Sequence, residues 1–223
     1  MKQIWVIANW KANKNIAEAL EWVAQVGPQL PRRQDLKVAV CPEFDALEEV
    51  KKAVKVGNFP LLVGVQDLSP FPPGAYTGEE AAENLKGLAD LAILGHSERR
   101  QNFGETDQMV EEKVNQALEN GIRPLVCVQS AETPLPKLCK LVAYEPIFAI
   151  GSGHPDTPED ADSVAHALKQ KWGLELEVLY GGSVDDQNAN NFVRQVNISG
   201  LLIGKSSLDS DEFIRIVRNI PHG

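Results

Sequence analysis

Eight short apolar runs, rich in β-branched residues, recur along the whole chain and constrain its fold more than any other feature. Most residues within each run are apolar, which is typical of parallel strands buried on both faces. The runs cover residues 4–8, 37–41, 61–65, 91–94, 125–128, 141–144, 178–180 and 201–203.

The segments between these runs contain apolar residues at helical spacing. A helix is predicted around 109–118, with Thr106 as its N-cap and Gly121 just past its end. Further helical patterns lie at 161–172, opened by Pro158, and at 189–196 and 213–217. Eight strand–helix alternations predict an α/β fold, and eight parallel strands in a chain of this length favour a (β/α)8 barrel. An open, doubly wound sheet is the alternative.

One connection is too short for the regular pattern. Only residues 129–140, including Pro134 and Pro136, separate the fifth run from the sixth. A crossover between parallel strands needs about a dozen residues, so we predict that this helix is shortened or missing. No linker or change in composition divides the chain, and we therefore predict a single barrel domain over residues 1–223.

Composition excludes several classes of protein. Hydrophobic residues make up 43% of the chain and the formal net charge is −9, so we expect neither disorder nor binding to nucleic acid or to a membrane surface. The three cysteines, Cys41, Cys127 and Cys139, are far apart and form no CxxC pair. We therefore expect no metal site, no disulfide and a cytoplasmic location. Cys41 and Cys127 lie at strand ends, where we expect them to be buried. No apolar run is long enough to span a membrane.

Polar side chains follow several of the predicted strands, where barrels carry their active sites. Asn9 and Lys11 follow the first strand, His96 and Glu98 the fourth, and Glu145 the sixth. Histidine is the usual proton carrier at neutral pH, and a glutamate ending a buried strand suits a general base. Each also has a structural interpretation, as a solvated loop charge or a satisfied core residue.

Glycines follow the last two strands. They lie in Gly181-Gly182-Ser183 and in Gly204-Lys205, the loops that often bind phosphate in barrels. Glycine lets backbone N–H groups approach an anion closely. The apolar segment 147–153 ends in a Gly-Ser-Gly sequence and is typical of a closing lid.

Six ordered motifs make the chain resemble the triosephosphate isomerase family. They are NWK at 9–11, AYTGE at 75–79, ILGHSERR at 93–100, GETD at 104–107, AYEPIFAIGSG at 143–153 and YGGSV at 180–184. The resemblance covers nearly the whole chain except the region around 129–140.

The resemblance implies interconversion of dihydroxyacetone phosphate and D-glyceraldehyde 3-phosphate, a step of glycolysis and gluconeogenesis, without metal or cofactor. Glu145 matches the catalytic base and His96 the electrophile that polarises the carbonyl. Lys11 matches the cation that faces the substrate, with Asn9 beside it, and Glu98 matches the carboxylate that orients this array. The residues that match the phosphate grip are Gly151, Ser183, Gly204 and Lys205.

The chain departs from the family pattern at several positions. Phe148 replaces a tryptophan of the lid, and His154-Pro155-Asp156 replaces Lys-Thr-Ala at its hinge. Lys205 replaces a glycine, so phosphate binding there requires backbone angles that a non-glycine residue can adopt.

The resemblance also bears on assembly. The segment 69–79 matches the loop that inserts into a neighbouring subunit, with Thr77 as its expected tip contact, and implies a homodimer. The short 129–140 connection leads to the hypothesis that a further subunit covers this flank and gives a tetramer.

Two other functions remain alternatives: a barrel that only binds a phosphate ligand or a partner protein, and a different sugar-phosphate isomerase. A different sugar-phosphate isomerase would lack the GHSERR and YEPIFAIGSG motifs. A protein that only binds a ligand or partner need not retain Glu145, His96 and Lys11 together.

Overall fold

The strands close into a parallel barrel in chain order. The computed structural model describes residues 2–146 and 156–223, and its strand order is β1-β2-β3-β4-β5-β6-β7-β8, with β8 returning to β1. The strands are β1 Ile4–Asn9, β2 Leu36–Cys41, β3 Leu62–Val65, β4 Leu91–Leu94, β5 Arg123–Val128, β6 Leu141–Tyr144, β7 Glu177–Tyr180 and β8 Ile198–Ile203. This confirms the barrel and overturns the open sheet.

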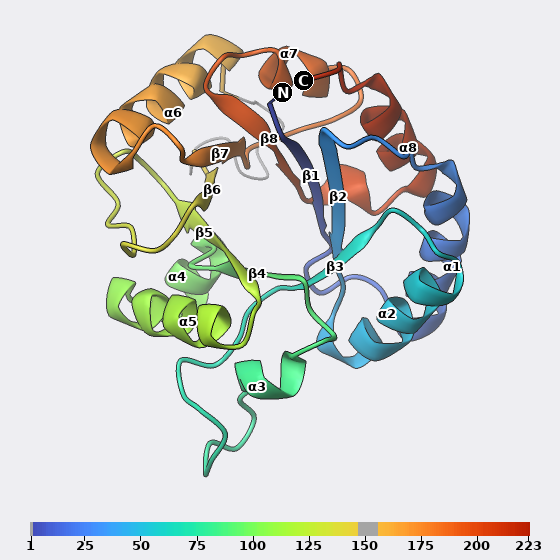
Figure 1. Cartoon of the computed structure of the whole chain (residues 1–223), viewed down its shortest axis with the longest axis vertical. Coiled ribbons are helices and arrows are strands. Elements are labelled where there is room, and N and C mark those ends of the chain that lie inside the picture. Colours follow the sequence, from blue (N-terminus) through green and yellow to red (C-terminus); the bar gives the residue numbers. More distant parts are fainter. Residues whose placement is uncertain (1, 147–155) are drawn as a thin grey trace.

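Helices surround the strands on the outside (Figure 1). They are α1 Ile16–Val26, α2 Leu47–Val56, α3 Ala82–Leu85, α4 Ser97–Phe103, α5 Asp107–Glu119, α6 Pro158–Trp172, α7 Ala189–Val193 and α8 Ser210–Asn219, with short 3-10 turns η1 Gly27–Gln29, η2 Phe44–Ala46 and η4 Lys205–Ser207. None of the helices in the described part of the chain combines the length and apolar character that a membrane span requires.

Local sequence explains where the helices start and stop. Thr106 caps α5 by accepting a hydrogen bond from the N–H of Met109, as predicted, and Gly121 follows the end of α5 with a positive φ of 73°. Thr157 caps α6 in the same way. The expected extension of the 189–196 helix is wrong, because α7 ends at Val193 and leaves Val196 81% exposed.

The connection between β5 and β6 contains turns and bends but no helix over residues 129–140. In Figure 1 this yellow segment runs between α5 and α6. Within this segment the side chains of Leu135 and Cys139 are buried, while that of Leu138 is 66% exposed. The segment therefore covers part of the barrel wall with a few apolar side chains in place of a helix.

The barrel interior and the barrel–helix layer form two separate apolar clusters. Alternate strand residues such as Ile7, Ile93 and Leu179 fill the interior, and their neighbours along each strand pack against the helices. The seam between β1 and β8 is tight, since a Cβ atom at Gly200 would lie 2.0 Å from the carbonyl oxygen of Trp5. Gly200 also has a φ of +150°, so closure of the barrel requires glycine here.

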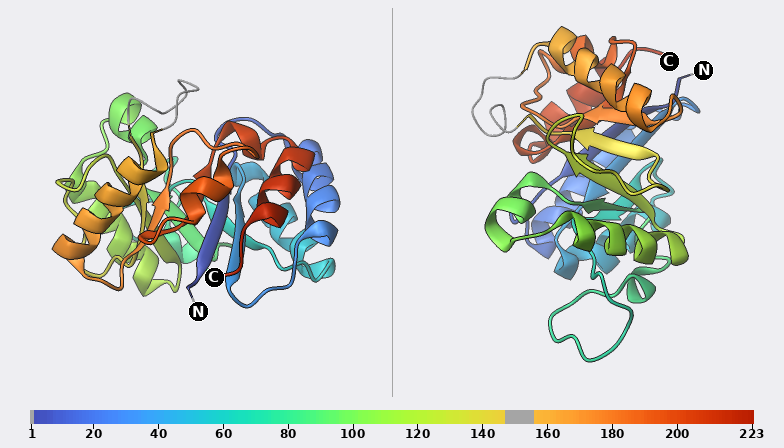
Figure 2. Two further views of the ribbon diagram at one scale, coloured as in Figure 1. Left: turned by 90° about the horizontal axis from the view of Figure 1, so that it is seen from above. Right: turned by 90° about the vertical axis from the view of Figure 1, so that its left-hand side faces the viewer.

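One segment projects well beyond the barrel. Residues 69–80 form a long loop between β3 and α3, seen at the bottom of Figure 1 and in the right-hand view of Figure 2. Its base is closed by a 2.9 Å hydrogen bond from the N–H of Ser69 to the carbonyl of Glu80. This loop and the carboxyl ends of the strands are the parts of the fold that concern function.

Candidate active site

The carboxyl ends of β1 and β4 open into one cavity of about 290 Å³. Asn9, Lys11, His96 and Glu98 all line it. Glu145, which follows β6, lies directly behind His96 and is 1% exposed. The fold therefore brings together the five side chains that the sequence placed at separate strand ends.

His96 is held in a defined tautomer. It caps the N-terminus of α4, and its Nδ1 accepts a 3.2 Å hydrogen bond from the backbone N–H of Glu98. The proton of the neutral ring is then on Nε2, which lies 2.9 Å from Oε1 of Glu145. The backbone N–H of Glu98 thus fixes Nε2 as the His96 nitrogen that can donate a proton, and in this structure it faces Glu145.

Glu145 is positioned by residues of β5, of α4 and of the loop after β7. Its N–H donates to the carbonyl of Val128 on β5 over 2.8 Å. Its second carboxylate oxygen accepts a 2.8 Å hydrogen bond from the N–H of Ser97. A Cβ atom at Gly181 would lie 3.2 Å from Cγ of Glu145, so the glycine after β7 leaves room for this side chain.

Lys11 is held in an uncommon backbone conformation. Its φ is +54°, a value that few non-glycine residues adopt. Its Nζ forms an ion pair with Glu98, and its backbone N–H donates to Oδ1 of Asn9 over 3.2 Å. Strained backbone of this kind persists where the surrounding contacts enforce it, often at functional sites.

Gln66 is the site residue that the sequence analysis missed. Its Nε2 donates to the carbonyl oxygens of Lys11, over 2.9 Å, and Cys41, over 3.1 Å, so it fixes Lys11 to the end of β2. Its position in the chain could have identified it. Gln66 directly follows β3, and the other site residues Lys11 and His96 also lie just after strands.

The loops after β7 and β8 reach the same mouth. A Cβ atom at Gly204 would lie 3.5 Å from Cε and 3.9 Å from Nζ of Lys11. Lys205 begins the turn η4 without a positive φ, so its backbone is allowed for a non-glycine residue, and its side chain is exposed. Ser183 is partly buried, and its carbonyl accepts from Nδ2 of Asn188 over 3.2 Å. Gly151, Phe148 and the hinge residues 154 and 155 lie outside the described residues.

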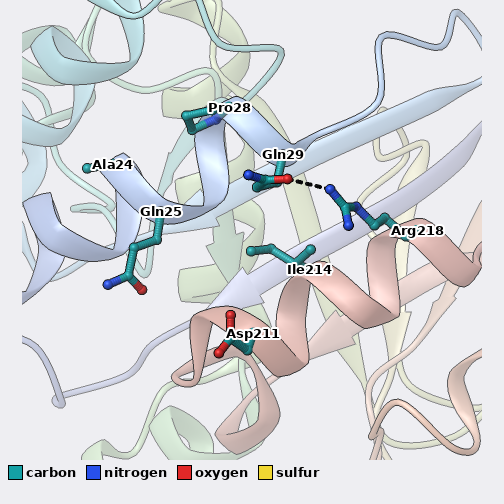
Figure 3. A pocket seen from close by; sticks show the side chains of 7 residues that line it. All are labelled: Ala24, Gln25, Pro28, Gln29, Asp211, Ile214 and Arg218. Atoms are coloured by element: carbon teal, nitrogen blue, oxygen red, sulfur yellow. Dashed lines mark hydrogen bonds between the residues drawn. The ribbon is translucent and has the colours of Figure 1, made fainter.

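A larger groove, of about 520 Å³, lies away from this mouth between α1 and α8 (Figure 3). It is lined by side chains such as Gln25, Asp211 and Ile214, and a hydrogen bond from Arg218 to Gln29 crosses it. Among the described residues, no histidine or cysteine lines this groove, and Asp211 is its one carboxylate. The smaller mouth cavity is therefore the candidate site.

The cysteines are all buried and unpaired, as expected for Cys41 and Cys127. Burial raises the pKa of Cys127, and the neighbouring carboxylate of Glu145 raises it further. Cys127 is thus an uncharged thiol that packs beside Glu145. Within residues 2–146 and 156–223, no group of three or more His, Cys, Asp or Glu side chains is arranged to hold a metal ion.

Comparison with known proteins agrees with this geometry. The family model described as triosephosphate isomerase matches residues 4–220. A protein of Leifsonia xyli named triosephosphate isomerase is 38% identical over 257 residues, which cover 100% of this chain and 99% of that protein. Proteins with the same name from Dehalococcoides mccartyi and Thermus thermophilus are each 36% identical and cover 98% of this chain, with 96% and 99% of their own lengths matched. The chain belongs to the triosephosphate isomerase family.

Proposed function

We propose that this chain interconverts dihydroxyacetone phosphate and D-glyceraldehyde 3-phosphate, with Glu145 as the base and His96 as the electrophile. The observation that carries the proposal is the 2.9 Å approach of His96 Nε2 to Glu145 Oε1 beside a cavity that Lys11 also lines. The relatives at 36–38% identity carry this activity in their names.

The proton moves in two steps. Glu145 takes a proton from the carbon next to the carbonyl, and the electron pair of that C–H bond forms the double bond of an enediol(ate). His96 donates from Nε2 to the carbonyl oxygen and passes a proton between the two oxygens. Glu145 then returns its proton to the neighbouring carbon, so that no atom is gained or lost.

Lys11 stabilises the negative charge that develops on the substrate. A cation fixed before the reaction costs no reorganisation in the transition state. Glu98 fixes the ammonium group of Lys11 through their ion pair, and Asn9 fixes its backbone. These three residues therefore act together on the oxygen side of the substrate.

The phosphate is bound by the loops after β7 and β8. Ser183, Gly204 and the backbone N–H of Lys205 form this part of the site. Gly151 is assigned to it by the family resemblance alone, because it lies outside the described residues. Because the exposed Lys205 side chain adds a positive charge near these N–H groups, it strengthens phosphate binding modestly. The phosphate group does not react, so the energy of binding it serves to position the rest of the substrate.

Turnover of glyceraldehyde 3-phosphate by the purified protein, without added metal or cofactor, tests the proposal. We expect dihydroxyacetone phosphate as the product. A folded protein that binds the substrate without converting it would instead support the phosphate-binding alternative.

The buried, unpaired cysteines favour a reducing compartment, and we place the activity in the cytoplasm.

We further propose that the protein is a homodimer built through the 69–80 loop. In this loop Phe71 and Tyr76 stack with ring centroids 4.3 Å apart, and both are at least 40% exposed. Phe44 and Phe103, also exposed, line the catalytic cavity, so exposed aromatic rings lie on both the loop and the mouth. Light scattering should give at least twice the 24.4 kDa chain mass, and Thr77→Arg should weaken the dimer.

The flank formed by residues 129–140 is a candidate for a second contact, giving a tetramer. Leu138 is 66% exposed there. Leu138→Glu should convert a tetramer to dimers, whereas Val56→Glu, at the exposed end of α2, should not. A wild-type mass of two chains at all concentrations would argue against the tetramer.

A further inference from the structure

Two residues contact Lys11 directly, and the residue after each of them forms a second contact. From the loop after β3, Gln66 donates to the carbonyl of Lys11 over 2.9 Å. From α4, Glu98 pairs with the ammonium group of Lys11. The residues that follow these two in the chain, Asp67 and Arg99, line the same cavity as Lys11 and meet each other, with Arg99 Nε 2.8 Å from Asp67 Oδ2.

Asp67 and Arg99, whose side chains are 14% and 33% exposed, join two buried charges in a cluster of four. The ammonium group of Lys113, on α5, donates to both carboxylate oxygens of Asp67 over 2.7 and 2.8 Å. It also forms an ion pair with Glu105, whose Oε1 lies 3.6 Å from Arg99 Nε. The side chains of Lys113 and Glu105 are 2% and 1% exposed.

The cluster is balanced, with two cations and two carboxylates. A buried charge that loses its partner is strongly unfavourable, so each member constrains the others. Asp67 has contacts to two of them, because it is bound by Lys113 from α5 and by Arg99 from α4. The loop after β3 and the start of α4 are thereby fixed to one point.

We propose that Asp67 is a positioning residue for Lys11. Its ion pair with Arg99 sets the distance between the two supports of Lys11, namely Gln66 at the backbone and Glu98 at the ammonium group. Two such supports match the requirement of a backbone held at a φ of +54°. The kinetic part of this inference rests on the proposed isomerase function.

Asp67→Asn tests the proposal, because it preserves the size of the side chain and removes its charge. We expect kcat/KM for the triose phosphate to fall roughly tenfold, mostly through kcat, because a displaced Lys11 stabilises the developing negative charge less well. The matched control is Asp90→Asn. Asp90 also pairs with a lysine, Lys51, over 2.7 Å, but at the opposite end of the barrel. The control should lower the melting temperature and leave kcat/KM unchanged.

Arg99→Gln is the second variant and covers the case in which Asp67→Asn does not fold. It leaves Lys113 paired with both carboxylates and removes only the link to α4, and it should lower kcat/KM in the same way. An unchanged kcat/KM in a folded Asp67→Asn or Arg99→Gln variant would overturn the proposal. An equal fall in Asp90→Asn would do so as well, because the effect would then follow general stability.

A measurement without substrate separates this inference from the proposed function. The ¹⁵Nζ resonance of Lys11, identified by its loss in Lys11→Arg, should shift or broaden in Asp67→Asn and remain unchanged in Asp90→Asn. If the wild type is inactive, the isomerase proposal fails while this resonance still decides the positioning role. A Lys11 signal that is identical in wild type and Asp67→Asn would refute it.

Discussion

The two ends of the barrel hold cavities of comparable size, about 290 Å³ at the carboxyl end and 340 Å³ at the amino end, but they differ in design. At the amino end the carboxylates are satisfied by donors that also stabilise the fold. Glu177 accepts from the indole N–H of Trp5 over 3.0 Å and lies 3.5 Å from Arg123. Arg123 in turn lies over the Trp5 ring, 5.4 Å from its centroid.

At the carboxyl end the contacts are less favourable for folding. Glu145 is 1% exposed and has a histidine and a backbone N–H as neighbours. Lys11 has a left-handed backbone. The comparison teaches that this fold has paired charges at both ends, but accepts backbone strain and a buried carboxylate next to a histidine at the end that carries the candidate site.

Glu145→Gln should have the largest effect on the carboxyl end. We expect the rate to fall roughly 10²–10⁴-fold, the usual contribution of a general base, with little change in melting temperature. Steady-state kinetics and calorimetry measure the two quantities. The control is Glu177→Gln at the amino end, which should lower the melting temperature and leave turnover intact; a loss of turnover there would break the comparison.

Gly200→Ala should have the largest effect on stability. The new methyl group would clash with the Trp5 carbonyl at the seam, and the φ of +150° is unfavourable for alanine. We expect the free energy of unfolding in urea to drop by roughly 3 kcal/mol. Gly78→Ala separates the two causes: Gly78 has a φ of +90° but no atom near its Cβ position, so it should lose only about 1 kcal/mol.

Asp35 provides a smaller, pH-dependent effect at the amino end. Hydrogen bonds from Arg33, and a further one from the N–H of Gly223, hold the pKa of Asp35 well below its ordinary value. A lowered pKa means that ionised Asp35 favours the folded state above the ordinary carboxyl pKa of about 4, and that this contribution is lost as the pH falls below it. Asp35→Asn should therefore melt lower than wild type at neutral pH, and the difference should shrink in acid. A difference that stays constant with pH would contradict this.

Cys139 should show the smallest effect. It lies in the helix-free connection, and burial raises its pKa to about 11. We expect iodoacetamide to modify it in the native protein far more slowly than in urea at mildly alkaline pH, because thiolate is the reactive form. Rapid native alkylation, read by mass spectrometry, would show that the 129–140 connection opens readily.

Much of the fold could be predicted because the strands are short and apolar. The boundaries of β4 and β6 coincide with the predicted runs at 91–94 and 141–144. β5 and β8 begin earlier than their runs, at Arg123 and Ile198, since Pro124 and Gly200 interrupt the local pattern and only pairing with neighbouring strands keeps them extended. Val196 fits a helical period but follows the end of α7, because the N–H of Asn197 binds Asp162 there.

The sequence by itself determined the alternation of strands and helices, the missing helix at 129–140, and the polar residues at the strand ends. These features depend on neighbours in the chain, and the motifs around His96 and Glu145 are local. The tertiary structure alone decided that Nε2 of His96 lies beside Glu145, that Gln66 supports Lys11, and that Asp67 meets Arg99 and Lys113. Those contacts join residues from different strand ends and from α5, and only closure of the barrel brings such residues within contact distance.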